Sequence, residues 1–280
     1  QKEHSERRHN MLYECVDIIS DGEENTTPAK LFTYLISDTT DQKRLRPAVI
    51  ICPGGGYCFT SDREAEPVAL QMIANGISAF VLRYHVAPAK YPTALFDLCE
   101  SIKYIREHAK EWSIDPNKIF TIGFSAGGHL ACCHALFWAH DWLSEKLKTT
   151  KEMIRPNGCI LSYPVITSGE YAHKDSFIQL LGNQYKELKD DHNLEKRVND
   201  QTPPMFLWHT YTDSTVPVEN SLLLVMALRK HSIPTEFHMY PVGEHGLTLA
   251  TKETMLADGT GYQPECAGWI DLAIAWLKRT

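Results

Sequence analysis

Hydrophobic and polar positions alternate in a regular rhythm along this chain from residue 48 to its C-terminal end. Short apolar runs of strand length alternate with longer stretches in which apolar residues recur every three or four positions. Several of the short runs are hydrophobic throughout, which is typical of strands covered on both faces. The predicted strands are residues 48–52, 77–84, 118–122, 158–162, 204–208 and 235–240.

Amphipathic stretches separate these runs and predict helices. In the clearest of them, Leu95, Leu98, Ile102 and Ile105 follow one another at spacings of three and four residues. The predicted helices are residues 64–75, 92–111, 127–140, 218–231 and 267–278. Strands that alternate with helices imply right-handed crossover connections and a doubly wound α/β sheet with helices on both faces.

Three segments depart from this alternation. Residues 13–19 and 30–36 are predicted as two more strands at an antiparallel edge, which makes a mostly parallel sheet of eight strands. Residues 167–203 are rich in Lys, Glu, Asp and Asn and contain one strong apolar cluster, at 177–181. We interpret them as a small cap-like insertion with a short helix, within a single α/β domain that spans residues 1–280.

Composition and charge narrow the classes of partner. The 280 residues carry 28 Lys+Arg and 35 Asp+Glu, a net charge of −7, which argues against nucleic acid as a partner. No apolar stretch approaches the ~20 residues that a membrane span requires, so no membrane partner is expected. The chain begins at Gln1 with a polar segment, and we expect a cytoplasmic protein while leaving a removed signal peptide open. The sequence does not indicate the oligomeric state.

Cysteine and histidine spacing gives no sign of a metal site. The eight cysteines are scattered without a C-x-x-C pair, and most lie in apolar runs, which favours buried free thiols in a reducing compartment. His129 and His134 are five residues apart on a predicted helix and therefore do not share a face. We expect neither a metal ion nor another cofactor.

The strongest local motif is Gly123-Phe124-Ser125-Ala126-Gly127-Gly128, between a predicted strand and a predicted helix. A serine on so sharp a turn has strained backbone angles, and small neighbours let the chain pass closely beside it. The turn also lifts the hydroxyl above the sheet edge, in front of a helix N-terminus. We therefore predict that Ser125 is a nucleophile; the alternative is a tight glycine turn with an idle serine.

A serine nucleophile needs a base, and the base needs an orienting carboxylate. His245 follows the predicted strand 235–240 in a glycine-flanked loop, and Asp213 follows the strand 204–208. The order Ser125, Asp213, His245 is that of one hydrolase architecture and of neither main endopeptidase type. The competing assignments are His209 as the base, Glu219 or Glu244 as the acid, and His85 as a residue that lines the site.

A second glycine-rich segment, Pro53-Gly54-Gly55-Gly56-Tyr57, follows the predicted strand 48–52. Glycines let backbone N–H groups approach a ligand closely, and the intermediate of acyl transfer carries an oxyanion that needs such donors. We predict an oxyanion hole made by the N–H groups of Gly55, Gly56 and Ala126. A phosphate-binding loop is the competing use, but neither the Lys-Ser/Thr pair nor the GxGxxG spacing is present.

Together these motifs resemble the α/β-hydrolase fold over residues 45–280. More closely, the chain is similar to the esterase group related to hormone-sensitive lipase and to BD-FAE-type carbohydrate acetyl and feruloyl esterases. The matching segments are residues 53–56, 123–128, 212–221 and 244–247. The lipase-like relatives place His before the three glycines, whereas Pro53 stands there in this chain, which favours the acetyl-esterase-like subgroup.

The resemblance implies hydrolysis of small acyl esters, above all acetyl esters, with acetylated sugars or xylo-oligosaccharides among the substrates to test. Members of the group are often named sugar hydrolases or xylanase-like proteins, but a glycosidase needs two carboxylates flanking the bond, and Ser125 favours ester cleavage. The alternatives are a general short-chain carboxylesterase, a small peptidase of the same fold and a non-catalytic ligand-binding protein. For the substrate pocket we predict Tyr57 and Tyr163, each after a strand; simple packing of the glycine segment is the alternative for Tyr57.

Overall fold

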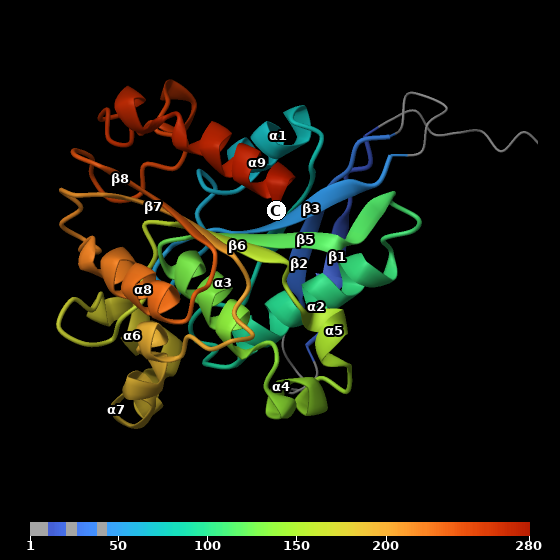
Figure 1. Ribbon diagram of the computed structural model, residues 1–280, viewed down its shortest axis with the longest axis horizontal. Helices are drawn as coiled ribbons and strands as arrows, with labels where there is room; N and C mark the ends of the chain where they lie inside the picture. The colour runs from blue at the N-terminus through green and yellow to red at the C-terminus, as the bar shows by residue number, and fades with distance from the viewer. Residues whose placement is uncertain (1–10, 21–26, 38–43) are drawn as a thin grey trace, which may run out of the picture.

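The structure is a computed structural model that describes residues 11–20, 27–37 and 44–280. These residues form an 8-stranded sheet in the order β1-β2-β4-β3-β5-β6-β7-β8 (Figure 1). The strands are β1 (Cys15–Ile18), β2 (Ala29–Tyr34), β3 (Arg46–Cys52), β4 (Ser78–Arg83), β5 (Ile114–Phe124), β6 (Gly158–Ser162), β7 (Met205–Thr210) and β8 (Thr235–Tyr240). The pairs β1–β2 and β2–β4 are antiparallel, whereas every other neighbouring pair is parallel. The predicted mostly parallel sheet with an antiparallel edge is therefore confirmed.

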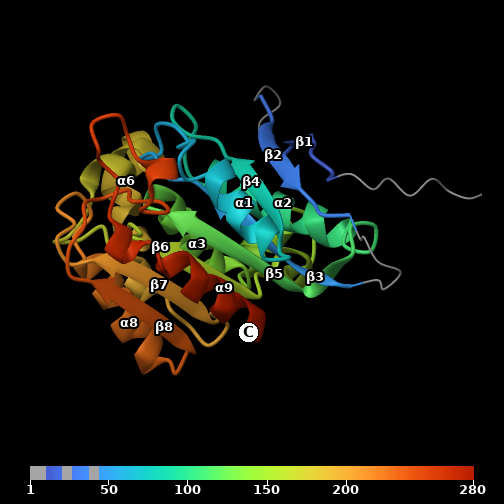
Figure 2. The same ribbon diagram turned by 90° about the horizontal axis from the view of Figure 1, so that it is seen from above.

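Helices cover both faces of this sheet, as the sequence predicts. The helices of the described residues are α1 (Glu66–Ala74), α2 (Thr93–Glu107), α3 (Ala126–Phe137), α4 (Asp141–Lys146), α5 (Lys151–Ile154), α6 (Lys174–Leu181), α7 (Tyr185–Leu188), α8 (Glu219–Lys230) and α9 (Trp269–Arg279). Short 3₁₀ segments are η1 (Gly182–Gln184), η2 (Lys189–His192), η3 (Leu194–Lys196), η4 (Lys252–Thr254) and η5 (Pro264–Cys266). Helices α2, α3 and α8 pack on one face of the sheet, and α1 and α9 pack on the other (Figures 1 and 2).

The two-sided burial of the central strands follows from their continuous hydrophobic sequence. In β3, Ile50 belongs to the core that includes Leu98 of α2, whereas its neighbour Ile51 belongs to the core that includes Met72 of α1. Successive side chains of a strand point to opposite faces, so both are buried only where helices cover both faces. The carboxyl ends of the parallel strands remain as the edge at which the connecting loops meet.

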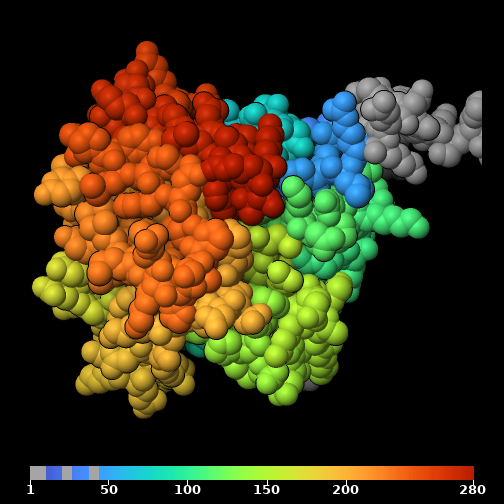
Figure 3. Space-filling view, viewed as in Figure 1, coloured from blue at the N-terminus to red at the C-terminus, as the bar shows by residue number. Residues whose placement is uncertain are grey.

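The segment predicted as an insertion, residues 167–203, lies between β6 and β7 and contains α6, α7 and the 3₁₀ segments η1, η2 and η3. Asn220 of α8 ties its start to the body of the protein. The Asn220 Oδ1 atom accepts hydrogen bonds from the N–H of Ile166 (2.9 Å) and of Thr167 (3.0 Å), and Nδ2 donates to Tyr171 O (2.9 Å). In Figure 3 the segment, in yellow and gold, forms a lobe at one end of the molecule.

Several element boundaries differ from those predicted, and two of these differences have a local structural cause. The helix predicted over 127–140 ends at Phe137, because His140 is extended (φ −76°, ψ 134°) and precedes the separate helix α4. Strand β5 begins at Ile114 and not at residue 118, since Ile114 pairs with Arg46 across an irregular register. The polar residues and the proline at positions 115–117 therefore lie within the strand, in its irregular first part.

The structure also bears on the expectations about membranes and thiols. In the described part of the chain, no helix has the length and apolar character needed to cross a bilayer. All eight cysteines are free thiols, and six of them are buried. The N-terminal segment 1–10, on which the signal-peptide expectation rests, lies outside the described residues.

Candidate active site

Ser125 occupies the tight turn between β5 and α3, at the carboxyl edge of the sheet. Its backbone has a φ of 52° and a ψ of −117°, a strained conformation for a residue with a side chain. The turn is held by hydrogen bonds from the Ser125 N–H to Ser162 O (3.0 Å) and from the Val165 N–H to Ser125 O (3.1 Å). The end of β6 and the residues after it therefore fix the place of the Ser125 hydroxyl at the start of α3.

The glycines beside Ser125 are required because the chain passes close to itself. A Cβ atom on Gly123 would lie 2.2 Å from Gly127 O, and a Cβ atom on Gly127 would lie 2.1 Å from Cys52 O. No side chain fits at these distances, and backbone atoms cannot move aside without opening the contact of α3 with β3 and β5. The motif found in the sequence thus has a steric cause.

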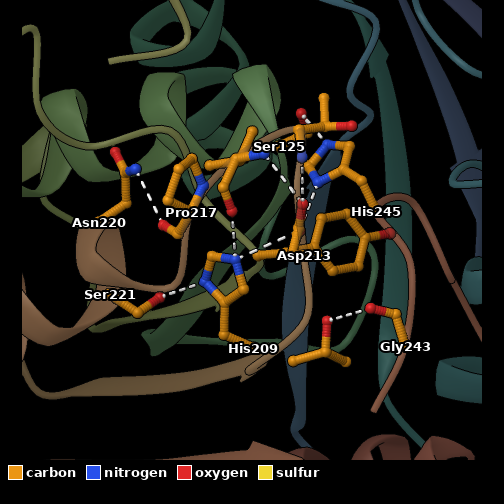
Figure 4. A network of polar contacts seen from close by, with 12 residues as sticks. Ser125, His209, Asp213, Pro217, Asn220, Ser221, Gly243 and His245 are labelled. Carbon is orange, nitrogen blue, oxygen red and sulfur yellow. Dashed lines mark hydrogen bonds and ion pairs between the residues drawn. The ribbon is translucent and has the colours of Figure 1, made fainter. Parts of the chain in front are cut away.

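The structure brings Ser125, His245 and Asp213 together (Figure 4). His245 Nε2 lies 2.7 Å from Ser125 Oγ, and His245 Nδ1 lies 2.7 Å from Asp213 Oδ2. An ionised carboxylate only accepts hydrogen bonds, so Nδ1 carries the proton and Nε2 is able to accept one from the Ser125 hydroxyl. This is the geometry that a general base and its orienting acid need.

Asp213 is buried behind His245, in the loop after β7, and is surrounded by donors. Its Oδ1 atom accepts hydrogen bonds from the N–H groups of Thr215 (3.0 Å) and Val216 (2.9 Å). Burial alone would raise the pKa of Asp213, but hydrogen bonds from His209 and His245 outweigh it and hold this pKa well below its usual value. Asp213 is therefore a carboxylate throughout the neutral range.

His209, the competing candidate for the base, contacts the acid and its loop (Figure 4). It is buried at the end of β7, and its Nε2 atom lies 2.9 Å from Val216 O and 3.3 Å from Asp213 Oδ2. Both partners are acceptors, so Nε2 carries a proton that it shares between them. On the other side of the ring, His209 Nδ1 lies 2.8 Å from Ser221 Oγ. His209 is thus a neighbour of the acid and not the partner of Ser125.

The glycine loop, residues 53–57, follows β3. The N–H of Gly54 is already engaged, because it donates to Glu64 Oε2 at 2.7 Å. Gly55 and Gly56 have φ values of 128° and 63°, which glycine adopts without strain. In the part of the chain that the structure describes, no protein group accepts a hydrogen bond from the N–H of either. Ala126 is the first residue of α3, so its N–H has no partner within that helix.

The two residues predicted to line the substrate pocket are buried beside the site. Tyr57 is 3% exposed, and its hydroxyl lies 2.8 Å from His129 Nδ1. Tyr163 is 1% exposed, and its hydroxyl donates to Glu64 Oε1 at 2.7 Å. The ring of Tyr163 also packs edge-on against His245. The hydroxyl groups of both tyrosines therefore bond to other protein groups. Glu64, which was not among the site residues predicted from the sequence, also lies beside the site.

The other histidines and carboxylates considered in the sequence analysis lie outside the hydrogen-bonded group of Ser125, His245 and Asp213. His85 Nδ1 lies 2.8 Å from Asp97 Oδ2, which makes it part of a polar contact with α2. Glu244 is exposed, and Glu219 is the first residue of α8. His134 bonds through Nε2 to the backbone of α5 at 2.8 Å. Among the described residues, no group of three or more His, Cys, Asp or Glu side chains is arranged to hold a metal ion.

Several known proteins are similar to this chain in sequence or in fold. The profile of the BD-FAE family matches residues 35–228. Endo-1,4-beta-xylanase B of Butyrivibrio fibrisolvens is 41% identical over 229 residues, which are 80% of this chain and 35% of that protein. Acetylxylan esterase of Xylanibacter ruminicola is 31% identical over 211 residues, which are 73% of this chain and 42% of that protein.

Among solved structures, the acetyl ester-xyloside bifunctional hydrolase from Caldicellulosiruptor lactoaceticus is similar over its whole length. The two chains superpose with a TM-score of 0.79 at 36% sequence identity, covering 95% of this chain and 96% of the other. This chain thus spans less than half the length of the two curated relatives but almost all of the solved one.

Proposed function

The chain belongs to the BD-FAE family of α/β-hydrolases, and on this basis we propose that it is a carboxylic ester hydrolase with Ser125 as its nucleophile. The observation that carries the proposal is the hydrogen-bonded series from Ser125 through His245 to Asp213, with 2.7 Å at both contacts. A hydroxyl beside an imidazole whose other nitrogen is held by a carboxylate is an activated nucleophile.

In the proposed mechanism, Ser125 Oγ attacks the carbonyl carbon of the ester while its proton moves to His245 Nε2. The tetrahedral intermediate collapses when His245 gives this proton to the departing alcohol oxygen, which leaves the acyl group on Ser125. Water then gives a proton to His245, attacks the acyl carbon and releases the carboxylic acid as Ser125 regains its proton. Asp213 stays ionised and stabilises the imidazolium in both halves of the reaction.

We assign the oxyanion of each tetrahedral intermediate to the N–H groups of Gly55, Gly56 and Ala126. Two observations support this choice of donors. The N–H of Gly54 is occupied by Glu64, whereas the next two N–H groups have no acceptor among the described residues. The third donor begins α3, whose positive dipole end faces developing negative charge. Removal of one donor of this kind typically costs about 100- to 1,000-fold in kcat.

The names of the relatives support acetyl groups on carbohydrate as the substrate class. One relative is named an acetylxylan esterase, and the structural relative is named an acetyl ester-xyloside bifunctional hydrolase. The relative named a xylanase extends far beyond the matched region, since this chain covers 35% of it. Cleavage of a glycosidic bond needs two carboxyl groups flanking that bond, whereas Asp213 is committed to two histidines. We therefore propose deacetylation.

We also propose that the insertion, residues 167–203, covers part of the substrate site as a small cap on a single-domain protein. His173 of the insertion bonds through Nδ1 to Ser176 Oγ at 2.9 Å, and that Oγ would lie 3.8 Å from a Cβ atom on Gly56. Burial lowers the pKa of His173, and the nearby His245 lowers it further. Ser176, and His173 bonded to it, thus lie beside the glycine loop, a position from which the insertion would contact the alcohol part of the ester and select among alcohols.

Steady-state hydrolysis of p-nitrophenyl acetate, butyrate and octanoate by the wild type and Ser125→Ala tests the proposal, followed by acetate release from acetylated xylo-oligosaccharides. We expect serine-dependent hydrolysis that is greatest for acetate, together with acetate release from the sugar. Preference for longer acyl chains without sugar deacetylation would indicate a general carboxylesterase instead. Equal turnover by Ser125→Ala would contradict the assignment of the nucleophile.

A further inference from the structure

Glu64 is a buried carboxylate that no step of the proposed reaction uses. It is 5% exposed and lies just before α1, beside the glycine loop. Its Oε2 atom accepts a hydrogen bond from the Gly54 N–H at 2.7 Å, and its Oε1 atom accepts one from the Tyr163 hydroxyl at 2.7 Å. A Cβ atom on Gly54 would lie 2.8 Å from Oε2, so only glycine lets the carboxylate reach this N–H without a clash.

Tyr163 extends this contact to the histidine loop, residues 241–250. Its hydroxyl oxygen accepts a hydrogen bond from the Thr248 N–H at 3.0 Å. Its ring meets the imidazole of His245 edge-on, with the ring centres 5.0 Å apart and an interplanar angle of 71°. Tyr163 and Thr248 both have positive φ values, 39° and 57°, a conformation that persists where the surroundings impose it. A continuous series of contacts therefore runs from Gly54 through Glu64 and Tyr163 to the histidine loop.

We propose that Glu64 and Tyr163 are positioning residues whose hydrogen-bonded bridge holds the glycine loop in a fixed place relative to the histidine loop. The oxyanion donors and the imidazole must act on the same carbonyl group, and the bridge sets their relative position. The inference rests on the proposed function, because it takes Ser125, His245 and the glycine N–H groups as the reacting machinery. In this proposal Glu64 and Tyr163 act on the reaction through Gly54 and His245 rather than by contact with the substrate.

Two apolar side chains would cost less free energy to bury at positions 64 and 163. Burial raises the pKa of Glu64, which means that its ionised form is penalised there, and the hydrogen bonds from Tyr163 and Gly54 offset part of the penalty. An apolar side chain, however, cannot accept the hydrogen bond of the Gly54 N–H, which holds the peptide between Pro53 and Gly54 in one orientation. Since glycines restrict the backbone little, the bond to Glu64 fixes where the glycine loop begins, and the bond from the Ser61 N–H to Gly54 O (3.0 Å) then orients the peptide that carries the Gly55 N–H.

Two variants of nearly unchanged size test the bridge. Glu64→Gln replaces one acceptor oxygen by a donor that faces another donor, and Tyr163→Phe removes the hydroxyl that joins the two loops. For p-nitrophenyl acetate we expect kcat to fall about tenfold or more in each variant, with KM within about twofold, because the lost contact acts in the transition state. Inhibition by phenylboronic acid, which forms a tetrahedral adduct with a serine nucleophile, should weaken by a similar factor.

The double variant provides a further readout. If Glu64 and Tyr163 act as one unit, the loss of kcat in the double variant will be smaller than the product of the two single losses. If the two substitutions caused independent packing defects, their losses of kcat would instead multiply. Because Tyr163→Phe keeps the ring against His245, it remains informative even where Glu64→Gln does not fold.

Asp97→Asn is the matched control. Asp97 is also a buried carboxylate, and it accepts hydrogen bonds from the His85 N–H (2.9 Å) and from Ser20 Oγ (3.0 Å). These partners belong to neither the glycine loop nor the histidine loop. We expect Asp97→Asn to lower the melting temperature while kcat and the inhibition constant of phenylboronic acid stay within about twofold of the wild type.

The outcomes separate the bridge from the proposed function. A wild type without serine-dependent ester hydrolysis would refute the proposed function before any variant is compared. A wild type with that activity, and bridge variants that keep kcat and boronic-acid affinity, would overturn the bridge alone. The bridge would also be overturned if Glu64→Gln and Asp97→Asn lost kcat to the same extent for the same fall in melting temperature.

Discussion

His209 and Asp213 form a buried pair in which the Nε2 atom of the imidazole lies 3.3 Å from Oδ2 of the carboxylate. The same oxygen is 2.7 Å from Nδ1 of His245, so the carboxylate lies between two imidazoles. Ser221 holds His209 from its other side, at 2.8 Å. This arrangement fixes Asp213 from behind and limits the positions that His245 takes in front of Ser125.

Loss of the contact between His209 and Asp213 should slow the reaction. In His209→Asn the amide remains near Ser221 but is too short to reach Asp213. Hydrogen bonds to charged groups contribute about 1.5–3 kcal/mol, so we expect kcat to fall roughly 10- to 100-fold, with little change in KM. The measurement is steady-state hydrolysis of p-nitrophenyl acetate.

His209→Gln is the control for this prediction, because its longer amide places an N–H near the position of Nε2. It should recover most of the activity that His209→Asn loses. Equal activity of His209→Asn and the wild type would show that the acid needs no support from behind.

Acid should destabilise the protein through buried neutral histidines. Burial lowers the pKa of His134 to about 4, an effect that its bond to the Ile154 carbonyl only partly offsets. The unfolded chain, with a His pKa of about 6.5, binds more protons than the folded one between pH 6.5 and 4. Stability from this group is therefore complete above about pH 6.5 and declines as the pH falls towards 4, by up to ~1.4 kcal/mol per pH unit.

His134→Gln tests this linkage, since its amide can still donate to the Ile154 carbonyl but does not titrate. Urea unfolding at pH 7, 6 and 5 should give a shallower loss of unfolding free energy in the variant than in the wild type. Identical slopes would mean that His134 is not the group responsible.

The glycines of the turn should be intolerant of a single methyl group. In Gly127→Ala the new Cβ would lie 2.1 Å from Cys52 O, a backbone atom. We expect a loss of at least about 3 kcal/mol of unfolding free energy, or no folded protein. Gly268→Ala is the matched control, because nothing lies within 4 Å of its Cβ position and its φ is −67°. A loss beyond about 1 kcal/mol there would contradict the steric account.

His173 should influence the choice of ester. If the insertion borders the alcohol part of the substrate, His173→Ala will change kcat/KM by different factors for acetate esters of different alcohols. Comparison of p-nitrophenyl acetate with an acetylated xylo-oligosaccharide measures this, and we expect the sugar ester to lose about tenfold more. Equal factors for both esters would place the insertion outside the substrate site.

The sheet and the group around Ser125 were predictable from the sequence for one physical reason. Ser125, Asp213 and His245 each follow an apolar run, and the carboxyl ends of parallel strands share one edge of the sheet. The short helices α4 and α5 were not predictable, because they are too short to show a repeating apolar face.

The role of Glu64 could not be predicted from the sequence. Its partner Gly54 lies 10 residues away and its partner Tyr163 lies 99 residues away, so only the folded chain brings the three together. A carboxylate just before a helix is ordinarily exposed, and nothing in its neighbours signals burial. Likewise, the sequence placed His209 near the acid but did not reveal that its Nε2 proton is directed to Asp213.

The central claim is that Ser125 is the nucleophile of an ester hydrolase, and covalent labelling tests it most directly. The wild type and Ser125→Ala are each treated with a fluorophosphonate, and the site of the adduct is located by peptide mass spectrometry. We predict one adduct on Ser125 in the wild type, loss of ester hydrolysis in proportion to labelling, and no adduct in Ser125→Ala. An adduct on another residue, or full hydrolysis after complete labelling of Ser125, would contradict the claim.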